Sequence, residues 1–146
     1  FQNEVLEKTG VDVEVISGTE EARLIYLGVL KAVPVFEIHG NKDPITKWNG
    51  DTDYSEEYGG YISVPDAIDF WVKKNECTQS VNDTLSNINI DDNSYIVSKK
   101  YTNGINNNEV WLYTLVGGKH DWPGSWGNKD IIAAEEIWKF FNRFVK

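Results

Sequence analysis

The sequence predicts an α/β fold in which a mixed sheet is flanked by helices. The clearest strand is the apolar run Val110 to Val116, and a glycine-rich loop separates it from the clearest helix, about Asp130 to Val145. Near the N-terminus, residues 11–16 alternate apolar and acidic side chains, residues 20–31 form a capped helical pattern, and residues 34–38 are apolar. Strand, helix and strand in this order predict a right-handed βαβ unit with two parallel strands.

The composition is that of a globular protein, and 146 residues are enough for one domain, 1–146, with a single core. The formal charge of −9 and the pI near 4.6 argue against binding to nucleic acid or to an anionic membrane, since both require a basic surface. No apolar run approaches the ~18 residues of a membrane span, and the N-terminus shows no signal-peptide pattern. We therefore expect a soluble protein, in which a site carrying a cation is electrostatically favoured.

Capping signals define the helices. Residues 1–8 are expected to form a short helix that ends at Gly10. A capping box, Ser17 to Glu20, opens the helix to about Lys31, which is apolar on nearly all sides and so predicts burial on more than one face. A second box, Ser63 to Asp66, opens a helix to about Lys74.

The remaining elements are a loop, a weak strand and a hairpin. The polar stretch 41–60 is expected to be a long, functional loop. A weak strand is predicted at 84–90, and residues 94–102 and 109–116 form a hairpin around an Asn-Gly turn. Cys77, which is the single cysteine, excludes an internal disulfide and is expected to be a packed or half-exposed thiol.

Polar and titratable residues follow two of the predicted strands. His39 and Asp43 come after the strand at 34–38, and His120 lies in the glycine-rich loop after the strand at 110–116. Parallel neighbouring strands would bring these strand ends to the same edge of the sheet, so Asp43 and His120 are predicted to form an acid–base pair. Two plainer interpretations remain open: His39 is a buried, hydrogen-bonded histidine, and Asp43 and His120 form a structural pair without turnover.

From about Val33 to the end, the chain resembles the C-terminal part of the polyhydroxybutyrate depolymerase and feruloyl esterase group of α/β-hydrolases. The motifs that carry the resemblance are His39-Gly40-Asn41-Lys42-Asp43-Pro44, the helix start Ser63-Val64-Pro65 running to Trp71, and Gly117-Gly118-Lys119-His120-Asp121-Trp122-Pro123-Gly124. It implies a truncated α/β-hydrolase-like sheet, with Asp43 as the triad acid and His120 as the triad base. That family usually has a cysteine pair here, whereas this chain has only Cys77.

Residues 14–29 resemble a different family, the exopolyphosphatases and guanosine pentaphosphate phosphatases of the actin-like ATPase fold. One of Glu20 and Glu21 would correspond to the catalytic carboxylate of that family. The glycine-rich phosphate loop that should follow is absent. The chain thus looks like a fusion of a phosphatase-derived fragment, 1–32, with a hydrolase-derived part, 33–146, so that the N-terminal βαβ unit is grafted onto the sheet.

The fusion leaves no nucleophilic serine in a Gly-x-Ser-x-Gly turn, which serine hydrolases of this fold require. The nearest approach is Pro123-Gly124-Ser125-Trp126-Gly127, and Ser125 is kept as a less favoured nucleophile. His39, Asp43 and His120 could instead hold a divalent metal, with zinc favoured and Asp121 as a further ligand. Such an ion would lower the pKa of its bound water to ~7.

The function predicted is that of a small hydrolase for activated carboxyl or phosphate esters of small molecules. Water activated by the metal or by His120 would replace the serine, and Trp122 and Trp48 would contact the substrate. The alternative is a non-catalytic folded remnant or binding module that uses a tryptophan-rich surface of Trp48, Trp122 and Trp126.

A homodimer is expected as well. The helix at 20–31 carries more apolar side chains than one packed face can bury, and a truncated sheet leaves an edge without a partner strand. Pairing two copies about a two-fold axis would cover both. The site would then lie either within one chain or between two.

Overall fold

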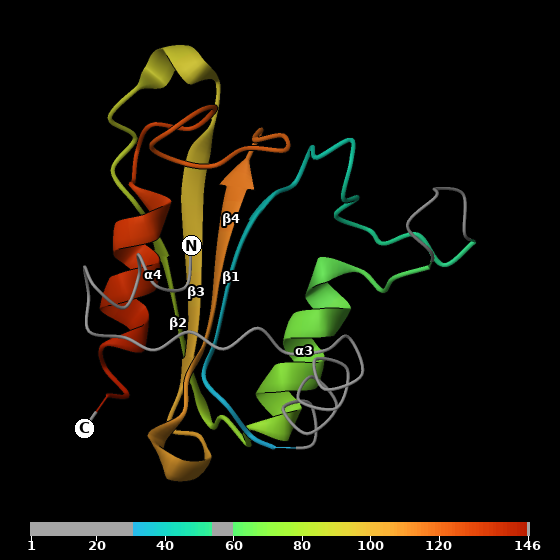
Figure 1. Ribbon diagram of the computed structural model, residues 1–146, viewed down its shortest axis with the longest axis vertical. Helices are drawn as coiled ribbons and strands as arrows, with labels where there is room; N and C mark the ends of the chain where they lie inside the picture. The colour runs from blue at the N-terminus through green and yellow to red at the C-terminus, as the bar shows by residue number, and fades with distance from the viewer. Residues whose placement is uncertain (1–30, 54–59, 146) are drawn as a thin grey trace, which may run out of the picture. The chain divides into compact units, whose positions relative to one another are not determined.

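The computed structural model describes residues 31–53 and 60–145 (Figure 1). The chain divides into two compact units, Phe1–Lys31 and Ala32–Lys146. Three predicted elements, the helix at 1–8, the strand at 11–16 and the helix at 20–31, lie outside the described residues, apart from Lys31. The grafted βαβ unit and the single-domain organisation therefore remain predictions.

The second unit is built on a four-stranded sheet in the order β1-β4-β3-β2. Its strands are β1 (Val35–Gly40), β2 (Gln79–Thr84), β3 (Tyr95–Thr102) and β4 (Val110–Val116). β1 runs parallel to β4, from Val35 beside Val110 to Gly40 beside Leu115. β3 is antiparallel to both β4 and β2. The predicted mixed α/β sheet is confirmed, and so is the hairpin of β3 and β4.

Two helices cover opposite faces of this sheet, α3 (Val64–Lys74) and α4 (Ala133–Phe141) (Figure 1). The predicted cap of α3 is present: the Ser63 hydroxyl accepts the Asp66 backbone N–H at 3.1 Å and donates to the Asp66 carboxylate at 2.6 Å. Short 3₁₀ turns lie at Ile90–Asp92 and Ile105–Asn107. Among the described helices, none is long and apolar enough to cross a membrane.

The strand predicted at 84–90 is misplaced. The strand occupies Gln79–Thr84 and pairs with β3. All six of its side chains are exposed, so this edge strand has no need of the apolar alternation that marks a strand in sequence. Beyond it, the Asp130 carboxylate accepts the backbone N–H groups of Ile88 and Asn89 at 2.7 and 3.2 Å, which holds that segment as a loop.

The C-terminal helix is shorter than predicted, Ala133–Phe141 in place of about 130–145. Asp130 is buried, and its carboxylate binds the loop at 88–89 and the Asn128 amide. Ile132 precedes the helix in extended conformation. The residues before α4 therefore anchor loops and do not continue the helix.

The two faces of the sheet are packed differently because side chains alternate along each strand. Towards α4, the core is aromatic, and Phe36 contacts the rings of Trp111, Tyr113 and Phe140 at centroid distances of 5.7, 4.7 and 5.3 Å. Towards α3, the core is smaller and aliphatic, with buried Val64, Ile68, Val110 and Leu112. The odd-numbered residues of β1 face this second layer.

The long loop after β1 is closed by a short pairing of its own. The backbones of Asp51 and Tyr61 exchange two hydrogen bonds, of 2.9 and 3.0 Å. The Lys47 backbone N–H donates to the Tyr61 hydroxyl at 2.9 Å. The predicted loop is present in its described residues, 41–53 and 60, and its first part is tied to the start of α3.

Candidate functional site

The carboxyl ends of β1 and β4 form a common edge of the sheet because the two strands are parallel neighbours. Three hydrogen bonds join the loop after β1 to the end of β4 and to the loop that follows β4. Asn41 N–H donates to the Leu115 carbonyl at 3.0 Å, and Lys42 N–H donates to the Gly118 carbonyl at 2.9 Å. The Asn41 side-chain oxygen accepts the Gly117 N–H at 2.9 Å. Residues far apart in sequence are thereby fixed side by side.

Gly40 permits this close approach. A Cβ atom at Gly40 would collide with the backbone of Gly118 and the carbonyl oxygen of Lys119. The collision would be with backbone, which cannot move aside as a flexible side chain can. The short distance between the two loops therefore requires glycine at position 40.

Asp43 and His120 meet across this junction. His120 Nδ1 donates to Asp43 Oδ2 at 2.9 Å. The second carboxylate oxygen, Oδ1, accepts the backbone N–H groups of Ile45 and Thr46 at 2.7 and 2.9 Å. The Asp43 side chain is 5 % exposed, whereas that of His120 is 59 % exposed. A buried carboxylate thus holds one nitrogen of an imidazole whose ring reaches solvent, and the structure brings Asp43 and His120 together at the edge that the two strands share.

The electrostatics of the pair favour an ionised carboxylate. Burial by itself would raise the pKa of Asp43, but the hydrogen bonds from His120, Ile45 and Thr46 outweigh burial and lower that pKa below its ordinary value. An ionised carboxylate only accepts, so His120 Nδ1 carries the proton of this contact. In the neutral ring Nε2 then holds a lone pair, which is the form that a general base requires.

The loop that carries His120 is held by its own contacts. Asp121 accepts the Lys119 N–H at 3.2 Å, and Trp126 Nε1 donates to the His120 carbonyl at 3.3 Å. Trp122 and Trp126 pair through their backbones and are 45 % and 57 % exposed. Two tryptophan side chains therefore lie at the surface of the histidine loop. The sequence predicts Trp122 as a substrate contact, and Trp126 is the second exposed aromatic side chain of this loop.

His39 and Trp48, also predicted site residues, lie on the face of β1 that is turned to α3. His39 Nδ1 lies 2.9 Å from the Gly40 carbonyl, while Nε2 is buried without a partner among the described residues. The Trp48 ring contacts the imidazole edge-on at 5.9 Å between centroids, and Trp48 packs against the aliphatic core. Trp48 is therefore a half-buried side chain that packs against this core.

The three predicted metal ligands are not gathered into one group. Within residues 31–53 and 60–145, no cluster of three or more His, Cys, Asp or Glu side chains is arranged to hold an ion. Both oxygens of Asp43 already accept hydrogen bonds, and Asp121 accepts from Lys119. Zinc binding by His39, Asp43 and His120 stays a prediction, and this geometry does not supply it.

Two further candidates can be placed. Ser125 is exposed, and its carbonyl accepts the Lys129 ammonium at 2.6 Å; no hydrogen bond joins its hydroxyl to His120 in the described part of the chain. Cys77 is a half-buried free thiol, as predicted, and burial raises its pKa. Neither residue has the environment of an activated nucleophile.

Sequence reasoning missed Glu37. Its carboxyl lies largely buried on the same side of β1 as His39, and this burial raises its pKa, while the neighbouring His39 acts in the opposite direction. The signal was available, because Glu37 is a charged residue in the middle of the apolar strand Val35 to Ile38. Burying a carboxyl group costs free energy unless the group is hydrogen-bonded.

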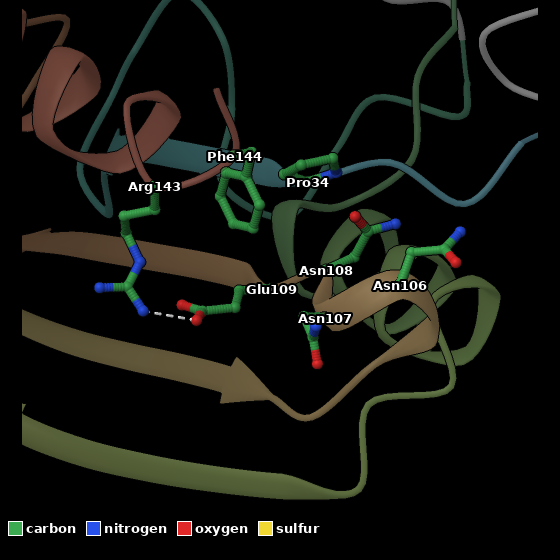
Figure 2. Close-up of a pocket in the computed structure, with 7 residues that line it drawn as sticks. All are labelled: Pro34, Asn106, Asn107, Asn108, Glu109, Arg143 and Phe144. Atoms are coloured by element: carbon green, nitrogen blue, oxygen red, sulfur yellow. Dashed lines mark hydrogen bonds and ion pairs between the residues drawn. The ribbon is translucent and has the colours of Figure 1, made fainter. Parts of the chain in front are cut away.

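A pocket lies at the end of the sheet opposite to His120, before the starts of β1 and β4 (Figure 2). Its walls come from Pro34, Asn106, Asn107, Asn108, Glu109, Arg143 and Phe144. The carboxylate of Glu109 is fully engaged, since it accepts from the Arg143 guanidinium at 2.6 Å and from Trp111 Nε1 at 2.7 Å. Among the described residues that line this pocket, none is therefore a free acid or base comparable to His120.

Comparison of the sequence with models of known protein families and with curated proteins gives no match. The site is accordingly defined by its geometry: a buried carboxylate and an exposed imidazole at the carboxyl edge of two parallel strands.

Proposed function

We propose that the chain is a small hydrolase that uses His120 and Asp43 to activate water against carboxyl or phosphate esters of small molecules. The observation that carries the proposal is the 2.9 Å contact between His120 Nδ1 and the buried Asp43 carboxylate. We propose further that the sheet is a truncated relative of the α/β-hydrolase fold. The resemblance of the two loop motifs to that group supports this assignment.

In the proposed reaction, His120 Nε2 removes a proton from a water molecule as its oxygen attacks the carbonyl carbon or the phosphorus. The Asp43 carboxylate fixes the ring in the required tautomer and stabilises the imidazolium that forms. The proton then passes from Nε2 to the oxygen of the departing alcohol as the ester bond breaks. No positively charged group is assigned to the developing oxyanion, so activated esters with good leaving groups are the expected substrates.

Metal-assisted hydrolysis is the second route. Zinc bound by His39, Asp43 and His120 would polarise the substrate and lower the pKa of its water. The hydrogen bonds already made by Asp43 favour the route through His120 alone. Dialysis against EDTA separates the two, because only the metal route requires activity to disappear and to return with added zinc.

The test is hydrolysis of a panel of chromogenic carboxyl and phosphate esters. His120→Ala is expected to reduce the enzyme-dependent rate by about 10²–10⁴-fold, since this is the usual contribution of a general base. Circular dichroism should show that the variant remains folded. Glu135→Gln, an exposed change on α4, is the matched surface control. Unchanged hydrolysis by His120→Ala would remove the assignment, and loss with Ser125→Ala would point to a serine nucleophile.

A binding module without turnover is the competing function, and the exposure of Trp122 and Trp126 favours it. Paired aromatic surfaces suit the apolar face of a sugar-like ligand. This function predicts no hydrolysis above buffer, together with a saturable change in tryptophan fluorescence when sugars are added. Trp126→Ala should then abolish the fluorescence change.

The homodimer is retained as a proposal that rests on the apolar pattern of residues 20–31. Light scattering should give twice the 16.6 kDa chain mass. Leu27→Glu should dissociate or unfold the protein, because a charge would enter the apolar contact. A monodisperse monomer at high concentration would exclude the dimer.

A further inference from the structure

A second candidate site lies between β1 and α3, on the face of the sheet opposite to α4. It is a cavity of about 180 Å³. Its lining combines the outward residues of β1, the loop at 46–47, the segment before α3 and the helix itself: Val35, Glu37, His39, Thr46, Lys47, Tyr61, Ile62, Val64, Ala67, Ile68 and Trp71. Thr46 and Ile62 are exposed, so the cavity opens to solvent on their side.

His39 presents an unpaired acceptor in this cavity. The carbonyl oxygen of Gly40 can only accept, so the 2.9 Å contact places the proton of the neutral ring on Nδ1. Nε2 is then a lone-pair acceptor, and it is completely buried without a partner among the described residues. Buried polar atoms are rarely left unsatisfied, so this nitrogen calls for a hydrogen-bond donor.

Glu37 supplies a second polar group on the same wall. It lies two residues before His39, which puts both side chains on one face of β1. No hydrogen bond to its carboxyl is found within the described residues. Burial raises the pKa of this carboxyl and so disfavours its ionised form, while in either form the group offers an oxygen that accepts a hydrogen bond.

Apart from Thr46 on the exposed side, the rest of the wall is apolar or already paired. Val64, Ile68 and the Trp71 ring form the side contributed by α3. The Lys47 ammonium lies 3.5 Å from the Asp51 carboxylate, and the Tyr61 hydroxyl accepts the Lys47 N–H. The cavity therefore combines an apolar and aromatic surface with two polar groups that converge from one strand, which is the usual character of a small-molecule site.

We propose that this cavity binds a small neutral polyol, through adjacent hydroxyl groups that bond to His39 Nε2 and Glu37 while the C–H face packs on Trp71. A hydroxyl fits both partners, since it donates to the imidazole and can donate to or accept from the carboxyl group. A primary ammonium ion would need an ionised carboxylate, which burial disfavours. A metal ion would find two protein ligands, fewer than zinc sites in proteins provide.

This site is independent of the proposed hydrolysis, but the two are physically connected. Thr46 lines the cavity, and its backbone N–H holds the Asp43 carboxylate at 2.9 Å. A ligand in the cavity would thus rest against the segment that positions the acid of the pair.

The experiment is a titration of the full chain with glycerol and with erythritol, followed by ¹⁵N NMR of the histidine rings and by tryptophan fluorescence. Saturable binding should shift the Nε2 resonance of His39, because its lone pair gains a donor, and leave that of His120 in place. 1,2-Dimethoxyethane, which has the same oxygen spacing as a diol but no donor hydrogen, should produce no shift.

Two variants test the assignment. His39→Leu removes the acceptor and should weaken binding at least about tenfold, the size expected for a lost buried hydrogen bond. Ala67→Leu fills the space from the α3 side, keeps both polar groups and should also abolish binding, so it serves if His39→Leu does not fold. Glu135→Gln, on the opposite face, should bind as the unmodified chain does.

The proposal is overturned if the His39 signal does not move at saturating polyol, or if both cavity variants bind normally. It is also overturned if ethylamine or Zn²⁺ shifts His39 while the polyols do not. Loss of ester hydrolysis in His120→Ala has no bearing on these readings, so the two proposals can fail separately.

Discussion

The ends of β4 and β1 each carry a histidine, and the two histidines have opposite environments. His120, beyond the end of β4, is 59 % exposed and bonded to a buried carboxylate. His39, the second-last residue of β1, has a fully buried Nε2 without a partner among the described residues. Both rings are anchored through Nδ1, so the difference lies in what surrounds Nε2. At one site this nitrogen faces water, and at the other it faces a cavity.

The chemical role of each histidine is therefore set by the residues that surround it, and not by the residue type. The loop after β1 supplies Asp43 to His120, and it reaches His120 because Asn41 and Lys42 bind the backbone after β4. His39 lies within the strand and points towards α3, where the nearest polar side chain from the same strand is Glu37. An exposed Nε2 suits proton transfer, whereas a buried one suits recognition.

The largest expected effect comes from Gly40→Ala, which should disrupt the site of His120 and Asp43 and leave the cavity at His39 intact. The added methyl group would collide with the backbone at Gly118 and Lys119, so the two loops must separate. We expect a loss of about 1–3 kcal/mol in the free energy of unfolding, the usual cost of overpacking. Urea unfolding measures that loss, and hydrolysis should fall with it. Unchanged stability would mean that the backbones of the two loops do not approach each other at Gly40.

Much of this arrangement follows from the sequence, for physical reasons. The apolar β1 and β4 and the polar residues after them predicted an edge shared by Asp43 and His120, because parallel strands end together. β2 escaped prediction because an exposed edge strand carries no apolar pattern. The unpaired Nε2 of His39 could not have been found, since it depends on which way α3 and its loop pack. The zinc hypothesis failed to gain support for the same reason: ligand types were present in sequence, but not their convergence.

A smaller effect is expected for His39→Leu. The change removes a hydrogen bond to Gly40 but also removes a buried polar atom that has no partner, and it adds apolar contact. These contributions nearly cancel, so we expect the free energy of unfolding to change by less than about 1 kcal/mol. Thermal and urea unfolding of this variant test the contrast with Gly40→Ala. A loss of several kcal/mol would show that His39 is a satisfied core residue.

The smallest effect is a difference in how the two regions respond to pH. The folded pKa of Asp43 lies below its ordinary 3.8, so its contribution to stability is complete above that pH and is lost as the pH falls through the folded value. Glu37 has the opposite sign: its folded pKa lies above 4.5, so its ionisation removes stability as the pH rises through that value. Asp43→Asn should flatten the acid side of the stability profile, and Glu37→Gln should flatten the other side. Urea unfolding at several pH values measures both, and parallel profiles for the two variants would contradict the comparison.

The backbone pairing between Asp51 and Tyr61 has an evolutionary consequence. Its two backbone hydrogen bonds place Asp51 beside Tyr61, while Asp43 and its hydrogen-bond partners lie outside the interval between these two residues. The entropy of closing a loop grows only with the logarithm of its length, about 0.6 kcal/mol for each doubling. Insertions and deletions at 52–60 can therefore accumulate with little effect on the acid–base pair.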